Sequence, residues 1–153
     1  MSDVASDVRI CGSSEHLDAF RNRHFPNGFD GGLDFEIGLE KNREMYPTCA
    51  SGASACYASV TDWSYSDVSQ ADTGFDKQLT LYIDSKYNEP IDWFEGVIAL
   101  HPELRFDIFF RCYAEMAVGE ILASNGEITS CEERQHDDLT EEDRVCWGNL
   151  LDD

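Results

Sequence analysis

Hydrophobic and polar residues alternate in four stretches of the chain, and a period of two is the pattern of a β-strand. The first three stretches are residues 7–12, 35–39 and 79–84. The fourth, residues 104–114, is apolar at every second position, and Phe109 adds an apolar side chain to its other face. The pattern therefore predicts four strands, of which the last is long and largely buried.

Two further stretches have the spacing of amphipathic helices. Residues 13–25 begin with two serines, which can cap a helix, and then carry apolar residues at helical spacing. Residues 90–101 carry one apolar stripe between Pro90, which suits the first position of a helix, and Pro102, which stops it. We expect a helix in each stretch.

The last third of the chain predicts a hairpin and an acidic extension. Asn125-Gly126 lies between two strand-like segments in residues 120–131, and this dipeptide is a strong signal for a two-residue hairpin turn. Residues 132–153 are rich in acidic side chains. Within them Thr140, followed three residues later by Asp143, resembles the cap of a short helix.

The order of these elements predicts the α+β class. One antiparallel sheet with two helices on one face packs them most economically, as in the split β-α-β arrangement of ferredoxin-like type. Residues 1–153 would form a single ferredoxin-like domain. It would carry a loop-rich insertion at about 40–77 and an acidic C-terminal extension at about 132–153. Aromatic side chains in the insertion would pin it to the body of the domain.

The excess of acidic side chains is the most informative feature of the composition. The 153 residues contain 31 Asp and Glu against 11 Lys and Arg, for a formal net charge of −20. Such a surface repels phosphate backbones and anionic lipid, which excludes direct nucleic-acid binding through a basic footprint. No stretch of eighteen apolar residues predicts a membrane helix, and the first twelve residues do not resemble a secretory signal. We therefore expect a cytoplasmic protein whose six cysteines are reduced.

A family resemblance runs through the predicted strands and helices. The segments that carry it are DVRICGSSEHLDAFRNRHF, LYIDSKYNEPIDWFEGVIALHPELRFDIFFRCYAE and the hairpin around Asn125-Gly126. In these segments the chain resembles the YubB ferredoxin-like domain family of plasmid and phage proteins. The resemblance implies the ferredoxin-like fold and a mobile-element protein that meets host defences. It implies no catalytic chemistry, so we expect no catalytic residue, no metal and no cofactor.

The chain departs from the family's motifs in three places. The family's Asp-Thr-Ala-Trp-Ser-Pro-Pro stretch corresponds here to residues 84–90, of which the aspartate and the last proline match. Its Tyr-x-Glu-x-Gly stretch is matched by Tyr113 and Glu115, but Ala117 replaces the glycine. Its tryptophan-rich segment is reduced to Trp63.

Two kinds of chemistry compete with a purely binding role. Cys112 with His101 and Glu115 could form a thiol site, although a cysteine on a buried strand is more often a small core residue. Zinc could join the insertion to the C-terminal extension, although neither segment has a Cys-x-x-Cys knuckle. Its candidate ligands would be Cys49, Cys56, Cys131, His136 and Cys146.

The net negative charge supports a binding function and not a catalytic one. Duplex DNA carries one negative charge per ~1.7 Å of axis, so twenty charges correspond to about 34 Å, or roughly one helical turn. We therefore expect a non-enzymatic inhibitor that occupies the nucleic-acid channel of a host defence complex, with an anti-CRISPR or anti-restriction role. Its partner would be a basic nucleic-acid-binding host protein. The predicted contacts are Asp137, Asp138, Glu141, Glu142 and Asp143, a second patch of Asp92 and Glu95, and the aromatic anchors Trp63 and Tyr65.

Two alternatives to the inhibitor remain open. One is a zinc- or thiol-dependent enzyme with its site in the insertion. The other is an acidic housekeeping module adapted to high salt, which the ratio of three Lys to eight Arg permits. An acidic surface can also serve solubility alone.

Overall fold

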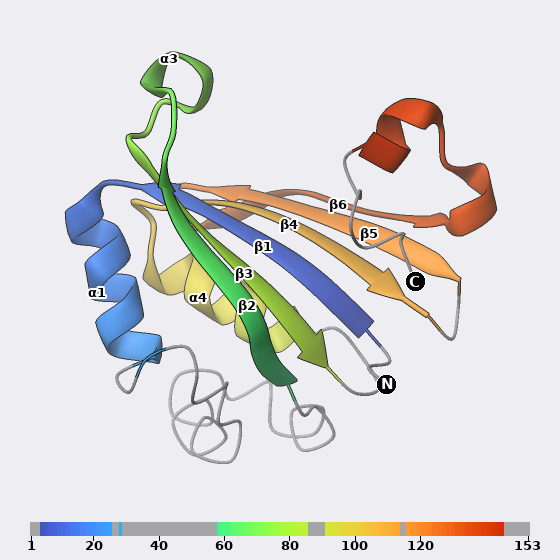
Figure 1. Ribbon diagram of the computed structural model, residues 1–153, viewed down its shortest axis with the longest axis horizontal. Helices are drawn as coiled ribbons and strands as arrows, with labels where there is room; N and C mark the ends of the chain where they lie inside the picture. Colours follow the sequence, from blue (N-terminus) through green and yellow to red (C-terminus); the bar gives the residue numbers. More distant parts are fainter. Residues whose placement is uncertain (1–3, 26–27, 29–57, 86–90, 114–115, 146–153) are drawn as a thin grey trace.

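The computed structural model describes residues 4–25, 28, 58–85, 91–113 and 116–145. The strands are β1 (Val4–Gly12), β2 (Ala58–Asp67), β3 (Lys77–Ser85), β4 (Arg105–Cys112), β5 (Ala117–Ser124) and β6 (Glu127–Gln135). The helical segments are α1 (Ser14–His24), α3 (Gln70–Thr73), α4 (Ile91–Leu100) and the 3₁₀ turn η4 (His136–Asp138), and a last helix begins at residue 141. Figure 1 shows their arrangement.

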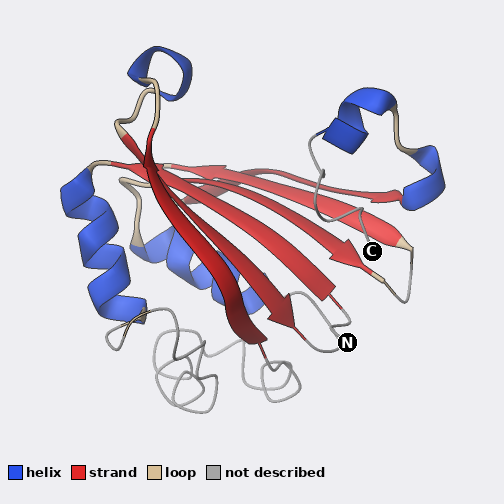
Figure 2. Ribbon diagram, viewed as in Figure 1, coloured by secondary structure: helices blue, strands red, loops and turns tan. Residues whose placement is uncertain are grey.

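The strands form one six-stranded antiparallel sheet in the order β2-β3-β1-β4-β5-β6. The first strand of the chain lies inside the sheet, paired with β3 on one side and β4 on the other. The meander β4-β5-β6 extends the sheet beyond β4 (Figure 2). The predicted α+β class is confirmed.

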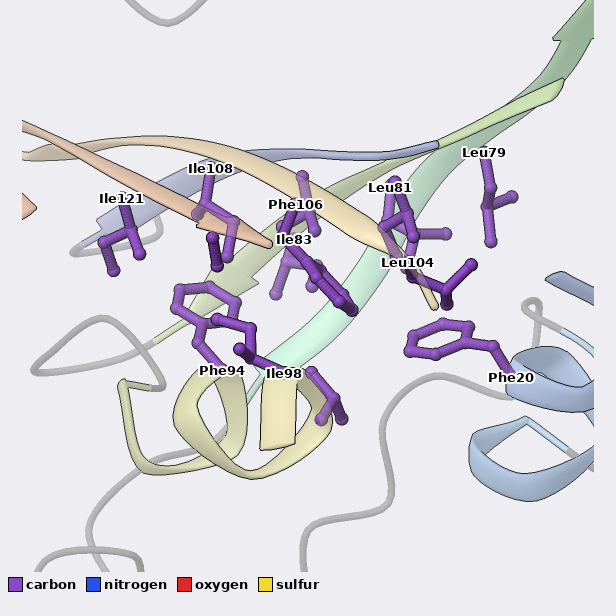
Figure 3. Close-up of a cluster of buried hydrophobic side chains, with 14 of the residues drawn as sticks. Phe20, Leu79, Leu81, Ile83, Phe94, Ile98, Leu104, Phe106, Ile108 and Ile121 are labelled. Carbon is purple, nitrogen blue, oxygen red and sulfur yellow. The ribbon is translucent and has the colours of Figure 1, made fainter. Parts of the chain in front are cut away.

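Helices α1 and α4 both lie against one face of the sheet, which we call the helix face. Phe20 from α1, and Phe94 and Ile98 from α4, point toward the apolar side chains of the strands (Figure 3). Burial of this apolar area supplies most of the stabilisation of the fold. The fully buried large side chains are Ile10, Leu17, Phe20, Leu79, Leu81, Ile83, Phe94, Ile98, Leu104, Phe106, Ile108 and Ile121.

The local signals for α1 and the hairpin act as predicted. Ser13 caps α1, since its hydroxyl accepts a hydrogen bond from the backbone N–H of His16 at 3.2 Å. The β5–β6 turn places Asn125 at φ 55° and Gly126 at φ 78°. Two successive residues with positive φ are what a type I′ hairpin turn needs, and Asn-Gly tolerates this conformation best.

The predicted insertion at 40–77 is wrong over its second half. Residues 58–67 form β2 at the edge of the sheet, residues 70–73 form α3, and β3 begins at residue 77. A register shift between Val60 and Asp62 marks a β-bulge in β2. The extra residue breaks the period of two, so that a real strand has no regular alternation in its sequence.

Several predicted features lie outside the described residues. They are the strand at 35–39, the first part of the insertion, Pro90, Glu115, and Cys49, Cys56 and Cys146. Within the described part of the chain, none of the helices has the length and apolar character that a membrane crossing requires.

Candidate interaction surface

The face of the sheet opposite α1 and α4, which we call the open face, carries charged side chains in pairs. Arg9 contacts Asp7 at 3.1 Å, and Arg105 contacts Asp107 at 3.3 Å. The guanidinium of Arg9 also lies 4.9 Å from the centre of the Phe109 ring. These arginines are engaged by neighbouring side chains, so they neutralise carboxylates of the sheet rather than present positive charge to a partner.

The C-terminal segment, residues 136–145, folds over one end of the open face (Figure 1), and we call it the tail. Leu139 anchors it: this side chain is 9% exposed and packs with Phe109 and Val118 in a small apolar cluster that Ala5 borders. Sequence reasoning missed this role. The available signal was that Leu139 is the only aliphatic residue between Ile128 and Val145.

Reciprocal hydrogen bonds cap the last helix, as the sequence predicted. The backbone N–H of Thr140 donates to Asp143 Oδ2 at 3.0 Å, and the N–H of Asp143 donates to Thr140 Oγ1 at 3.2 Å. Arg134 of β6 then ties the helix to the sheet, since its Nη1 lies 2.7 Å from Asp143 Oδ1 and its Nη2 lies 3.0 Å from Glu132 Oε2. Asp143 is therefore engaged in holding the tail.

These contacts shift the pKa values of Asp143 and Arg134. The hydrogen bond from the Thr140 backbone, with the bonds to the Thr140 hydroxyl and Arg134, lowers the pKa of Asp143. The hydrogen bonds to Asp143 and Glu132 raise the pKa of Arg134. Because the lowered pKa belongs to a carboxylate, its contribution to holding the tail is present at neutral pH and is lost only as the pH falls through that pKa.

Four acidic side chains of the tail are exposed: Asp137, Asp138, Glu141 and Glu142. We call them the tail patch. On β6 the exposed Glu132 lies on the open face beside Arg134, and the exposed Glu133 points to the other face of the sheet. Only Arg134 and Arg144 carry positive charge between residues 127 and 145. The chain therefore concentrates negative charge at this edge of the sheet, on a scaffold fixed by Leu139 and Arg134.

Like charges also face one another where β5 meets β6. Glu120 lies directly opposite Glu132. Burial raises the pKa of Glu120, and the negative charges of Glu132 and Asp107 raise it further. Directly opposed like charges destabilise a strand pair, and Arg134, which contacts Glu132, opposes this repulsion by lowering the pKa of Glu120.

Comparison with known proteins finds no relative of this chain. The chain matches no family model, no curated protein and no solved structure.

The other predicted contacts do not join the tail patch. Trp63 and Tyr65, 41% and 36% exposed, lie on β2, at the opposite edge of the sheet from β6. Five strand spacings of ~4.8 Å separate these edges by about 24 Å. Glu95 is exposed on α4, which covers the helix face, and the side chain of Asp92 lies outside the described residues.

The structure also separates the predicted thiol site. Cys112 is buried in the core at the end of β4, and His101 precedes the beginning of that strand. The eight residues of β4 are seven steps of ~3.3 Å apart from end to end, so about 23 Å separates the two ends of the strand. Cys11, Cys112 and Cys131 are free thiols, and within the described ranges no three His, Cys, Asp or Glu side chains converge as metal ligands. The side chain of His136 lies outside those ranges.

Leu139→Ala is expected to loosen the tail. Removing this buried side chain should lower the free energy of tail opening by about 2 kcal/mol, at the low end for a buried leucine because the cluster is small. Hydrogen exchange at the Arg144 amide, which bonds to the Thr140 carbonyl at 3.0 Å, reports on this opening. Val145→Ala, at a side chain 82% exposed, is the control and should change little. Equal exchange in both variants would contradict the anchoring role.

Proposed function

We propose that the protein is a non-enzymatic acidic inhibitor, encoded by a phage or plasmid, that binds a basic nucleic-acid-binding defence complex in the host cytoplasm. The tail patch occupies sites that normally hold phosphates, so the protein acts as a DNA mimic of anti-CRISPR or anti-restriction type. The observation that carries this proposal is the exposed row Asp137, Asp138, Glu141 and Glu142 on an anchored tail.

The arrangement of charge supports the proposal. Arg9 and Arg105 of the open face are paired within the chain, whereas the four carboxylates of the tail patch are exposed to solvent. Carboxylates can accept the hydrogen bonds that Arg and Lys give to phosphate oxygens. The net charge of −20 equals that of about 34 Å of duplex DNA.

We further propose that β1-α1-β2-β3-α4-β4 is a ferredoxin-like unit, to which β5, β6 and the tail are an extension. The order β2-β3-β1-β4 and the position of both helices on one face support this assignment. The resemblance to the YubB ferredoxin-like domain family agrees with it. On this assignment the tail patch belongs to the extension and not to the shared unit.

The test is competition with DNA for purified CRISPR effector and restriction complexes. The variant neutralises the tail patch, with Asp137→Asn, Asp138→Asn, Glu141→Gln and Glu142→Gln. Exposed ion pairs contribute ~0.2–1 kcal/mol each, so losing four should weaken inhibition by about fourfold or more, mainly through slower association. Asp143 stays unchanged because it holds the tail to Arg134.

A matched variant removes four exposed acids elsewhere. Glu15→Gln, Asp18→Asn, Asp62→Asn and Asp76→Asn change the net charge by the same amount but leave the tail patch intact. This control variant should inhibit almost as well as the unchanged protein. Inhibition by the control variant and by the unchanged protein should weaken as the salt concentration rises. Equal losses in the two variants would mean that net charge alone acts. Simultaneous binding of DNA and protein to one target would rule out mimicry.

A further inference from the structure

Two histidines from distant parts of the chain meet where α1 and α4 end. His24 is the last residue of α1, and His101 follows the last residue of α4. Their Nε2 atoms are 2.8 Å apart, and the rings meet edge to face with centroids 5.0 Å apart. In such a contact one ring nitrogen donates and the other accepts, so at least one imidazole must be neutral.

The surroundings of the pair are mostly aromatic. The Phe20 ring packs against both imidazoles, with centroids 4.9 Å from His24 and 5.2 Å from His101, and Phe106 of β4 lies behind it. His101 is 8% exposed. A second positive charge in this position would therefore be poorly solvated.

Two charged side chains act on His101 from the adjoining elements. Burial lowers the pKa of His101, Arg23 of α1 lowers it further, and Glu103 of the turn before β4 opposes them. On α1 the nearby Arg21 contacts Asp18 at 3.8 Å. The balance therefore favours a neutral His101 in the folded protein.

We propose that the His24–His101 pair is a pH-sensitive latch, which joins the ends of α1 and α4 at neutral pH and releases them on acidification. A first proton can be shared, since one imidazolium still donates to one neutral imidazole. A second proton removes the acceptor and sets two cations against each other. The latch is complete above the ordinary histidine pKa of about 6.5 and is lost progressively below it, because the opened state binds more protons.

Two backbone hydrogen bonds report on the latch from its two sides. The N–H of Phe25 donates to the Arg21 carbonyl at 2.8 Å, where α1 ends. The N–H of Leu104 donates to the His101 carbonyl at 3.1 Å, in the turn after α4. Opening of the latch should expose both amides while those of the central strands stay protected. The tail lies on the other face of the sheet, so failure of the latch would not bear on the proposed inhibitor function.

The experiment is hydrogen exchange by NMR on the full chain between pH 7 and pH 5, together with titration of the histidine ring signals. In the unchanged protein, protection factors at Phe25 and Leu104 should fall by about tenfold per pH unit in the range where the second proton binds. In His101→Gln, whose amide can donate or accept but takes no proton, they should vary with pH by less than about twofold.

Two further variants make the result decisive. His16→Gln removes an exposed histidine from the same helix and should keep the full pH dependence, which controls for the many carboxylates that titrate nearby. His24→Gln breaks the pair from its more exposed side, and it replaces His101→Gln if that variant fails to fold. The latch is disproved if the unchanged protein shows no loss of protection at pH 5, or if removing either paired histidine leaves the loss unchanged.

Discussion

Phe106→Ala is expected to destabilise the domain by about 3–5 kcal/mol, the cost of deleting a fully buried aromatic ring. Phe106 is 0% exposed and lies on β4, where its ring meets that of Phe20 from α1 at 6.3 Å between centroids. The ring therefore helps to hold α1 against the sheet, and its loss leaves a cavity that the paired strands cannot collapse to fill. The free energy of unfolding in urea measures the effect.

Met116→Ala is the control for Phe106→Ala. Met116 is also a large apolar residue, but it is 50% exposed in the turn between β4 and β5. Surface substitutions usually stay within about 0.5 kcal/mol. Because small domains have only ~5–15 kcal/mol in total, the Phe106 variant should be partly unfolded under mild denaturant where the Met116 variant is not. Similar midpoints for the two would show that the ring is not part of the core.

Gly119→Ala should also destabilise the fold strongly, by about 3 kcal/mol, although it adds a single methyl group. Gly119 on β5 lies directly opposite Phe110 on β4. A Cβ atom at position 119 would overlap the Phe110 ring, which covers the glycine. The ring is itself 4% exposed within the core and has little room to move. Thermal or urea unfolding measures the loss.

A second substitution tests this cause. Phe110→Leu shortens the side chain that covers Gly119, so the double variant Phe110→Leu, Gly119→Ala should be at least ~1 kcal/mol more stable than the sum of the single changes predicts. Simple additivity of the two losses would instead locate the cost of Gly119→Ala in the backbone of β5.

Local sequence signals predicted most of the described helices and strands, because these elements depend little on contacts with residues distant in the sequence. Alternation marked β3 and β4, the serine cap marked α1, and Asn125-Gly126 marked the hairpin. The edge strand β2 was missed for a physical reason. Its bulge puts Val60 and Trp63, three residues apart, on the same face, which a search for a period of two discards.

The candidate surface was only partly visible in the sequence. The acidic residues of the tail and the Thr140–Asp143 cap were predictable because they are local in the chain. The roles of Leu139 and Arg134 depend on what the folded sheet brings beneath them, as does the meeting of His24 with His101. Periodicity carries no information on contacts between residues so far apart in sequence.

The inner position of β1 determines when this strand can join a sheet during synthesis of the chain. Val4 pairs with Ser85 of β3 and with Cys112 of β4, so the first strand gains both of its neighbours only after β3 and then β4 have been synthesised. Until then its apolar residues, Val8 and Ile10 among them, have no sheet in which to be buried. Such a high contact order slows folding, whereas the sequential meander β4-β5-β6 needs only short loops. Synthesis of β4 is therefore the step that gives β1 its second neighbour, and β5 then adds Ile121 to the core.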